Sequence, residues 1–176
     1  MRIISGKYRG RHFNPPKNIT ARPTTDFAKE SLFNLLQNRL DFEGLDVLDL
    51  FAGTGSIGLE FVSRGARTVT SVELAHTQQN FIIATCKSLG VNNLTVIRGD
   101  VFKYVTSCHR EFDVVFADPP YSLDTLAIIP DLVFDNKILR NGGLFVLEHS
   151  AAYDFSANEH FSEHRSYGNV HFTFFE

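Results

Sequence analysis

Four consecutive residues, Asp118-Pro119-Pro120-Tyr121, carry the most distinctive chemistry of the chain. They follow the apolar run Phe112–Ala117, which is typical of a buried strand. Two successive prolines have fixed φ angles and no N–H, so they hold the Pro119 carbonyl rigidly. The Asp118 carboxylate and that carbonyl are then neighbouring acceptors, and Tyr121 adds an aromatic face. This combination predicts a site for a planar amine, with two N–H groups on the acceptors and the ring stacked on tyrosine.

The same two acceptors would activate such an amine. The lone pair of an exocyclic amine on a nucleobase is delocalised into the ring, which makes the nitrogen a poor nucleophile. Accepting hydrogen bonds from both N–H groups favours a pyramidal nitrogen whose lone pair can attack an electrophile. The arrangement is the counterpart of an oxyanion hole, with acceptors in place of donors. A simple proline turn capped by Asp118 is the alternative interpretation.

A glycine loop follows a second apolar run, Val47–Leu50. The segment Gly53-Thr54-Gly55-Ser56-Ile57-Gly58 matches the G-x-G-x-x-G pattern of dinucleotide-binding loops, and Glu73 lies near the spacing of a ribose contact. However, Asp49 stands four residues before the loop, where a carboxylate could repel a pyrophosphate. It would suit the ammonium and sulfonium groups of S-adenosylmethionine, which has no phosphate, and the glycines would then allow close backbone approach. We favour S-adenosylmethionine and keep a nicotinamide dinucleotide as the alternative.

Acidic residues close four separate predicted strands, at the edge where parallel sheets bind ligands. They are Asp49, Glu73, Asp100 and Asp118. Glu73 would accept hydrogen bonds from two ribose hydroxyls, and Asp100 would accept one from an adenine amino group, with Val101 or Phe102 beside the ring. The predicted cofactor-binding residues are Asp49, Phe51, Ala52, Gly53, Thr54, Gly55, Glu73, Leu74, Asp100 and Val101. Since the sequence has no cluster of metal ligands, no metal is expected.

Alternating strand and helix patterns must position these residues. Strands are predicted at 47–50, 68–72, 94–97, 112–117 and 144–148, the last after a turn at 142–143, and helices at 57–63, 75–89, 126–132 and 134–139. An earlier helix, capped by Thr24 or Thr25, would bury a stripe formed by Phe27, Leu32, Leu35, Leu36 and Leu40. A closing hairpin joins 161–167 to 170–175. The pattern predicts an α/β fold, with a mostly parallel sheet covered by helices on both faces and one antiparallel edge.

The net charge of −3 conceals a basic N-terminal segment. Residues 1–30 carry a charge of +5 and the remaining 146 residues carry −8. Short extended runs at 2–5 and 11–13 flank a glycine-containing turn and predict a hairpin, and prolines make the next stretch an extended linker. A basic arm on an acidic body suggests contact with a polyanion. The predicted RNA-binding residues are Lys7, Arg9, Arg11 and Arg22, and a solvated basic surface is the alternative interpretation.

Length and composition limit the class of protein. A chain of 176 residues fits one domain, with an arm and linker over 1–23 and a catalytic core over 24–176. There is no apolar window long enough for a membrane helix and no signal-peptide core at the start. The two cysteines form no C-x-x-C pair, which argues against a disulfide scaffold or a zinc site. We therefore expect a cytoplasmic protein with reduced thiols, without membrane contact and monomeric.

Several segments resemble the RsmD family of methyltransferases. They are residues 1–11 (MRIISGKYRGR), 22–26 (RPTTD), 49–60 (DLFAGTGSIGLE), 63–66 (SRGA), the tetrapeptide at 118–121 and Tyr167-Gly168. The resemblance implies a seven-stranded class I (Rossmann-like) fold with an N-terminal hairpin. It also implies methylation of the N2 amine of one guanine in 16S ribosomal RNA, naked or in an assembling small subunit. Asp118, Pro119, Pro120 and Tyr121 would be the catalytic residues. No basic residue stands where one is expected shortly after Glu73.

Other functions remain open at this point. A DNA adenine-N6 methyltransferase shares the tetrapeptide chemistry, although such enzymes usually need extra mass to read sequence and flip a base. A nicotinamide oxidoreductase would use the glycine loop. An RNA-binding protein without catalysis would keep the arm but has no need of the amine site.

Overall fold

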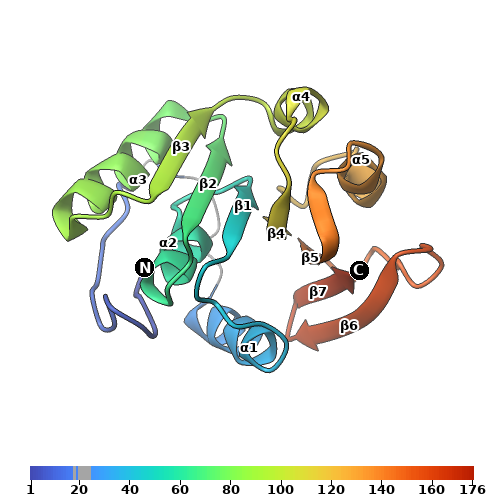
Figure 1. The fold of residues 1–176 in the computed structure, drawn as a ribbon, viewed down its shortest axis with the longest axis horizontal. Coiled ribbons are helices and arrows are strands. Elements are labelled where there is room, and N and C mark those ends of the chain that lie inside the picture. Colours follow the sequence, from blue (N-terminus) through green and yellow to red (C-terminus); the bar gives the residue numbers. More distant parts are fainter. Residues whose placement is uncertain (18, 20–24) are drawn as a thin grey trace.

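The computed structural model describes residues 1–17, 19 and 25–176, and this part forms a seven-stranded sheet with helices on both faces (Figure 1). The strands are β1 (Asp46–Leu50), β2 (Thr68–Glu73), β3 (Leu94–Arg98), β4 (Phe112–Ala117), β5 (Leu139–His149), β6 (Phe161–Tyr167) and β7 (Val170–Phe175). The helices are α1 (Asp26–Gln37), α2 (Ser56–Ser63), α3 (His76–Leu89), α4 (Val101–Ser107) and α5 (Ile129–Asp135), with a 3-10 turn η1 (Leu126–Ile128) before α5.

The strand order of the sheet reverses between β1 and β4. Neighbours in the sheet are β3-β2-β1-β4-β5-β7-β6, in which β1 to β5 are parallel and β7 lies antiparallel between β5 and β6. The chain leaves β1 toward β2 and β3 and then crosses to β4 on the other side. Open α/β sheets bind ligands at such a reversal, outside the carboxyl ends of the strands. The predicted mostly parallel sheet with an antiparallel edge is confirmed.

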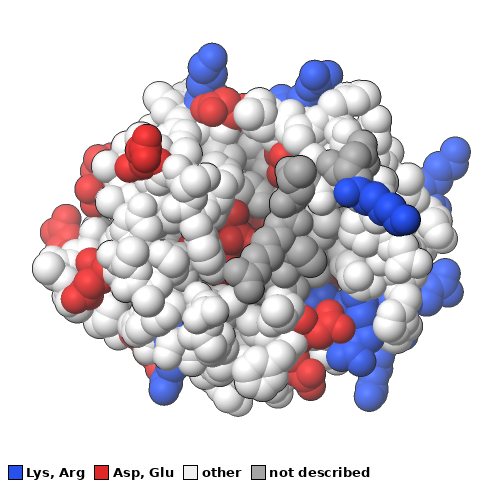
Figure 2. All heavy atoms as spheres, turned by 180° about the vertical axis from the view of Figure 1, so that it is seen from behind, with Lys and Arg blue, Asp and Glu red and all other residues white. Residues whose placement is uncertain are grey.

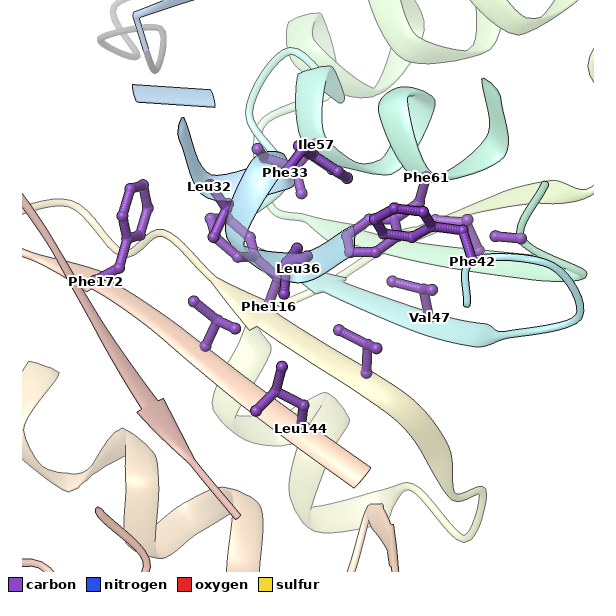
Figure 3. Packing of buried hydrophobic residues seen from close by; sticks show 14 of the residues in the cluster. Leu32, Phe33, Leu36, Phe42, Val47, Ile57, Phe61, Phe116, Leu144 and Phe172 are labelled. Atoms are coloured by element: carbon purple, nitrogen blue, oxygen red, sulfur yellow. The ribbon is translucent and has the colours of Figure 1, made fainter. Parts of the chain in front are cut away.

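Two large apolar cores hold α1, α2, α4 and α5 against the sheet, and a smaller cluster with Ile82 and Cys86 holds α3. Residues of α1 and α2 pack on one face, and residues of α4 and α5 pack on the other. Figure 3 shows the first core, where Phe33 of α1, Phe42 and Phe61 of α2 form a cluster of rings with centroids 4.8–5.9 Å apart. Each of these rings removes roughly 150–250 Å² from water, so the cluster fixes α1 and α2 relative to the sheet.

Helix α1 begins as predicted but differs in its buried stripe. Thr25 is the N-cap, and its Oγ1 accepts a hydrogen bond from the Ala28 N–H at 3.2 Å, while Thr24 lies outside the described residues. Leu32 and Leu36 are buried. The prediction that Phe27 is buried is wrong, because this side chain is 68% exposed. Ala28 and Lys29 of the same turn are buried, so Phe27 lies on the side of α1 that faces away from the core.

Three further differences from the sequence predictions lie around α4 and β5. Residues 101–107 form helix α4, which the sequence analysis did not predict because the segment is short and has polar residues on both sides. The helix predicted at 134–139 ends at Asp135, because Lys137 has a left-handed φ of 53° that breaks it, and Leu139 already belongs to β5. The glycines at 142–143 lie within β5, where the pairing with β4 shifts register, and do not form a turn before it.

The N-terminal segment forms the predicted hairpin, with minimal strand character. Arg2 and His12 make an isolated antiparallel bridge. The Ile3 N–H donates to the Arg11 carbonyl at 3.0 Å, and the Gly10 N–H donates to the Ile3 carbonyl at 2.9 Å. Residues 1–13 therefore fold back on themselves, and we call them the N-terminal arm.

Candidate active site

The loop after β1 has an unusual backbone. Phe51, Gly53 and Gly55 have φ angles of 57°, 55° and 74°, in the left-handed region. A Cβ atom on Gly55 would lie 2.8 Å from Cγ1 of Ile82 in α3, so only glycine fits there. Left-handed φ costs a non-glycine residue about 1–2 kcal/mol, and such strain gathers at ligand sites. Ala52 and Thr54 are buried, so the loop presents mainly its backbone at the carboxyl edge of the sheet.

Asp49 points from β1 into the protein. Its Oδ2 accepts hydrogen bonds from the Gly58 N–H at 3.1 Å and from the Ser71 hydroxyl at 3.5 Å. Because the Gly55 cap of α2 offers no side-chain acceptor, Asp49 satisfies an N–H in the first turn of that helix. Burial raises the pKa of Asp49 to about 7, and the neighbouring Glu73 carboxylate contributes in the same direction. The Asp49 carboxylate is therefore buried beside the start of α2, where it bonds the backbone that follows the glycine loop.

Glu73 ties the glycine loop to α3. Its Oε2 accepts from the Gly53 N–H and its Oε1 accepts from the Ala75 N–H, both at 2.8 Å. The side-chain amide of Gln79 donates to the Glu73 carbonyl at 2.6 Å. The next residue, Leu74, is 65% exposed beside this acid. A carboxylate offers about four lone-pair positions, so Glu73 can accept further hydrogen bonds from a ligand.

Asp100 is the N-cap of α4. Its Oδ1 accepts from the Lys103 N–H at 3.0 Å, which fixes the carboxylate at the end of β3. The Val101 side chain is buried in the apolar core beneath α4, in the cluster against which Phe51 of the glycine loop also packs. Phe102 is only partly buried, and its ring meets that of Phe51 edge-on with centroids 6.3 Å apart. Of the two apolar residues predicted beside an adenine, Phe102 is therefore the one that faces the glycine loop.

The tetrapeptide leaves β4 next to the glycine loop. The Asp118 N–H donates to the Leu50 carbonyl of β1 at 3.3 Å, so the loops after β1 and β4 meet where the strand order reverses. Pro119 is buried and Pro120 is exposed. The Pro120 carbonyl accepts from the Leu123 N–H at 2.9 Å, which closes the turn after Tyr121. The side chain of Tyr121 is 37% exposed.

Glu148 belongs to this site and was missed by the sequence analysis. The Tyr121 hydroxyl donates to its Oε1 at 3.3 Å. Ala117 of β4 pairs with Leu147 of β5, so Asp118 and Glu148 come next on adjacent parallel strands and share one face. Glu148 is 4% exposed. The signal was available, because Glu148 closes the fifth predicted strand as the other acids close theirs.

The N-terminal arm is fixed to α2. The Ile4 and Ser5 N–H groups donate to the two carboxylate oxygens of Glu60 at 2.8 and 3.0 Å. The ammonium of Lys29, buried in α1, lies 3.8 Å from the same carboxylate and donates to the Ser56 hydroxyl at 2.9 Å. Burial lowers the pKa of Lys29, and the Glu60 carboxylate opposes that shift. One buried acid thus joins the arm, α1 and α2.

The tip of the arm lies at the end of α2 distant from the glycine loop. The Lys7 N–H donates to the Ser63 carbonyl at 2.7 Å, and the Tyr8 N–H donates to the Ser63 hydroxyl at 3.0 Å. Lys7, Arg9 and Arg11 are exposed. Arg22, the fourth predicted RNA-binding residue, lies outside the described residues. The arm therefore presents its cations beside α2 and not over the tetrapeptide.

Charge is divided across the surface. Figure 2 shows acidic side chains inside a hollow near the centre of one face. Lys and Arg gather on the side that carries the N-terminal arm, and Asp and Glu gather on the opposite side. In the described ranges no group of three or more His, Cys, Asp or Glu residues could hold a metal ion, and no helix is long and apolar enough to cross a membrane.

The reversal of strand order between β1 and β4, completed by an antiparallel hairpin at one edge, is the class I methyltransferase fold, and a putative methyltransferase from Escherichia coli shares it with a TM-score of 0.87 at 30% identity. Within this class the family can be stated. The family model described as Conserved hypothetical protein 95 matches residues 1–176, and the chain belongs to this family, the RsmD family of methyltransferases.

Relatives and solved structures agree with this assignment. Ribosomal RNA small subunit methyltransferase D of Escherichia coli is 32% identical over 148 residues, which cover 84% of this chain and 74% of that protein. The protein of the same name from Haemophilus influenzae is 34% identical over 152 residues, covering 84% and 78%. The structure of a hypothetical protein from Thermus thermophilus superposes with a TM-score of 0.88 at 28% identity, covering 100% of this chain and 99% of that one.

Proposed function

We propose that this chain transfers a methyl group from S-adenosylmethionine to the exocyclic N2 amine of a guanine in 16S ribosomal RNA. The observation that carries the proposal is the meeting of Asp118, Tyr121 and Glu148 at the ends of the adjacent strands β4 and β5. Relatives that are named small-subunit ribosomal RNA methyltransferases support the substrate class.

The acids beside the glycine loop suit S-adenosylmethionine better than a dinucleotide. Asp49 already occupies the Gly58 N–H, a donor at the start of α2 that a pyrophosphate would need. Glu73 is held by the Gly53 N–H with lone pairs left for two ribose hydroxyls, and Asp100 stands at the end of the next strand for an adenine amine. When bound, this cofactor supplies an electrophilic methyl group on a sulfonium sulfur.

Asp118 and the Pro119 carbonyl activate the target amine. The Asp118 N–H bonds the Leu50 carbonyl and Pro119 is buried, so the backbone that carries both acceptors is fixed at the end of β4 before the amine arrives. Hydrogen bonds from the two N–H groups favour a pyramidal nitrogen, and the lone pair turns toward the methyl donor. Asp118, as the charged acceptor, also stabilises the positive charge that develops on the nitrogen as the N–C bond forms and the methyl–sulfur bond breaks, and it can accept the proton that the methylated amine loses.

Glu148 provides a physical reason for guanine. Beside the N2 amine, guanine carries an N1–H donor, whereas adenine carries an N1 lone pair beside its N6 amine. A carboxylate next to Asp118 can accept a hydrogen bond from guanine N1–H and would be repelled by adenine N1. Tyr121 bonds Glu148 through its hydroxyl and offers its ring for stacking on the base. This difference favours guanine N2 over the DNA adenine-N6 alternative.

The proposal is tested with purified protein and 16S ribosomal RNA from cells that lack the gene. After incubation with S-adenosylmethionine, nuclease digestion and mass spectrometry should give N2-methylguanosine. N6-methyladenosine in a parallel DNA reaction, without any product in RNA, would favour the adenine alternative. In a separate measurement, S-adenosylmethionine should raise the melting temperature and NAD should not.

Variants of the acceptors connect the product to the site. Asp118→Ala removes one preorganised acceptor and should lower the single-turnover rate by roughly 10²–10³, whereas Asp118→Asn keeps an oxygen and should retain more activity. Glu148→Gln weakens a charged acceptor and should cost about 10-fold. Asp124→Ala, an exposed acid in the same loop region, is the matched control and should be silent. If Asp118→Ala methylated at the rate of the parent, this mechanism would be wrong.

A further inference from the structure

We propose that Phe27 and Tyr167 form a stacking platform for an unpaired base that lies close to the target nucleotide. The inference rests on the proposed RNA methylation and adds a second binding position to it. We call this pair the Phe27–Tyr167 platform. Its ring centroids are 6.1 Å apart with planes at 80°, an edge-to-face contact.

The exposure of Phe27 is the first observation. Its side chain is 68% exposed, the largest value among the exposed large hydrophobic side chains of the described residues. The α1 core does not need it, since Phe33 and Leu36 fill that role. Tyr167 is only half-covered, and Phe172 supports it from below with centroids 6.1 Å apart. A rigid aromatic surface that faces solvent and is supported by the core is suited to a planar ligand.

The platform lies on the same edge of the sheet as the active site. Strand β6 is parallel to β5, because both are antiparallel to β7, so Tyr167 ends β6 at the carboxyl edge. The packing of helix α1 independently places Phe27 near this carboxyl edge. Lys29, two residues after Phe27, bonds Ser56 at the start of α2, beside the glycine loop.

The separation from the target fits a neighbouring nucleotide. Strands β4 and β6 are three strand spacings apart in the sheet, which is roughly 14 Å. A continuous row of contacts bridges this distance. Tyr121 bonds Glu148, Glu148 pairs with Phe172 across β5 and β7, and Phe172 supports Tyr167. A single strand that places one base on Tyr121 can therefore place a base a few nucleotides away on Phe27.

The charges around the platform favour contact with a base. Arg165 lies two residues before Tyr167 on the same face, where it pairs with Glu163 and is half-exposed. On the other side, Arg2 lies 3.3 Å from Asp26. Glu30 is also exposed nearby. Among the described residues around the platform, basic side chains therefore do not outnumber acidic ones. Stacking on the rings, with Arg165 available to one phosphate, is the mode of sequence-tolerant single-strand binding.

The test compares Phe27→Ala with Phe27→Trp in binding and in catalysis. The binding probe is a fluorescein-labelled 15-residue polyuridine RNA, and the substrate is 16S ribosomal RNA from cells that lack the gene. Phe27→Ala should raise the Kd and the KM by about 5- to 150-fold, the range for losing one base–aromatic stack. Phe27→Trp should bind at least as tightly as the parent. The kcat at saturating RNA should stay within about twofold, since the amine acceptors are untouched.

Three readouts separate stacking from other causes. The salt dependence of binding should keep its slope in Phe27→Ala, because no phosphate contact is lost. Ile83→Ala, a similarly exposed hydrophobic residue on α3, is the matched control and should bind like the parent.

Equal RNA affinity of Phe27→Ala and parent would overturn the platform while leaving RNA methylation intact. So would a change of oligomeric state in Phe27→Ala, which would make the ring a contact between copies. A parent protein that neither binds nor methylates RNA would overturn the proposed function itself.

Discussion

The phenol of Tyr121 donates a hydrogen bond to Oε1 of Glu148 at 3.3 Å, which connects the loop after β4 to the end of β5. The contact holds the tyrosine ring across the ends of two parallel strands. The ring is partly exposed above the bond, so its face is available to a base while its hydroxyl is anchored. The hydroxyl therefore has a positioning role in addition to the stacking expected of the ring.

Replacing Tyr121 by phenylalanine isolates that positioning role. Tyr121→Phe keeps the stacking face and removes a hydrogen bond to a carboxylate, so the single-turnover rate should fall by about 3- to 10-fold. Tyr121→Ala should also lose stacking worth about 1–3 kcal/mol. Tyr104→Phe on α4, away from the tetrapeptide, is the control. If Tyr121→Phe and the parent react equally fast, the bond to Glu148 does not orient the ring.

Cofactor affinity should depend on pH through Asp49. Burial raises the pKa of Asp49 to about 7, so this group is largely protonated in the free protein below that pH. A cationic ligand favours the carboxylate, so binding S-adenosylmethionine should release a proton below pH 7. Calorimetry should therefore show the Kd rising as pH falls from 7 to 5.5, by at most about 10-fold per unit. In Asp49→Asn the profile should be flat, and an equally steep profile in that variant would assign the effect to another group.

The docking of the N-terminal arm can be tested at two glycines with similar backbones. Gly6 and Gly10 have φ angles of 79° and 80°, so alanine is strained at both, by about 1–2 kcal/mol. Only Gly6 faces the body, where a Cβ would lie 1.8 Å from the Ser63 carbonyl oxygen. Gly6→Ala should therefore free the arm and speed hydrogen exchange at the Lys7 and Tyr8 amides. Gly10→Ala, with open space around it, should leave their protection in place; equal exchange in both variants would contradict the docking geometry.

The cations of the arm should set the salt dependence of RNA binding. Arg9 and Arg11 are exposed beside α2, so the double change to glutamine should reduce the slope of log K against log salt by about 0.7 per lost phosphate contact. The control is the double change of Arg110 and Lys137 to glutamine, which removes the same charge at the amino ends of β4 and β5. Equal slopes in the two doubles would mean that the arm acts only through net charge.

Features that depend on local pattern could be predicted from the sequence. The acids at 49, 73, 100 and 118 all lie within two residues of the carboxyl end of a strand, because short apolar runs and glycine turns are local signals. Thr25 as the cap of α1 and the closing hairpin follow from the same kind of evidence. These elements determine the sheet and therefore the edge at which the site forms.

Features that depend on packing between distant segments could not be predicted from the sequence. Asp49 was expected to face a ligand, and it bonds the Gly58 N–H, nine residues along the chain. The docking of the arm depends on Glu60, a helix residue to which the sequence analysis assigned no role. In each case the partner becomes apparent only when β1, α1 and α2 are brought together.

Three histidines at the end of the sheet should make the fold sensitive to mild acid. Nε2 of His164 lies 3.0 Å from Nδ1 of His171, so the neutral pair shares one proton, and protonating both rings would set two donors against each other. His149, whose ring lies 5.8 Å from each, is buried, with Nδ1 against the Ser150 carbonyl at 2.8 Å. Burial lowers the pKa of His149 and of His171, and the nearby His164 contributes to both shifts.

The direction of the effect follows from these lowered pKa values. The unfolded chain binds more protons than the folded one between the ordinary histidine pKa of about 6.5 and the lower folded values. Stability from the neutral rings is therefore complete above pH 6.5 and lost as pH falls through the folded pKa values, by at most about 1.4 kcal/mol per pH unit for each proton taken up.

Urea unfolding at pH 7 and pH 5.5 should show this loss in the parent. His171→Gln removes one titrating ring and the facing donor pair, so its stability should change less between the two pH values. His109→Gln, at an exposed histidine before β4, should behave as the parent does. If His171→Gln lost as much stability as the parent between pH 7 and 5.5, the acid sensitivity would lie outside this cluster.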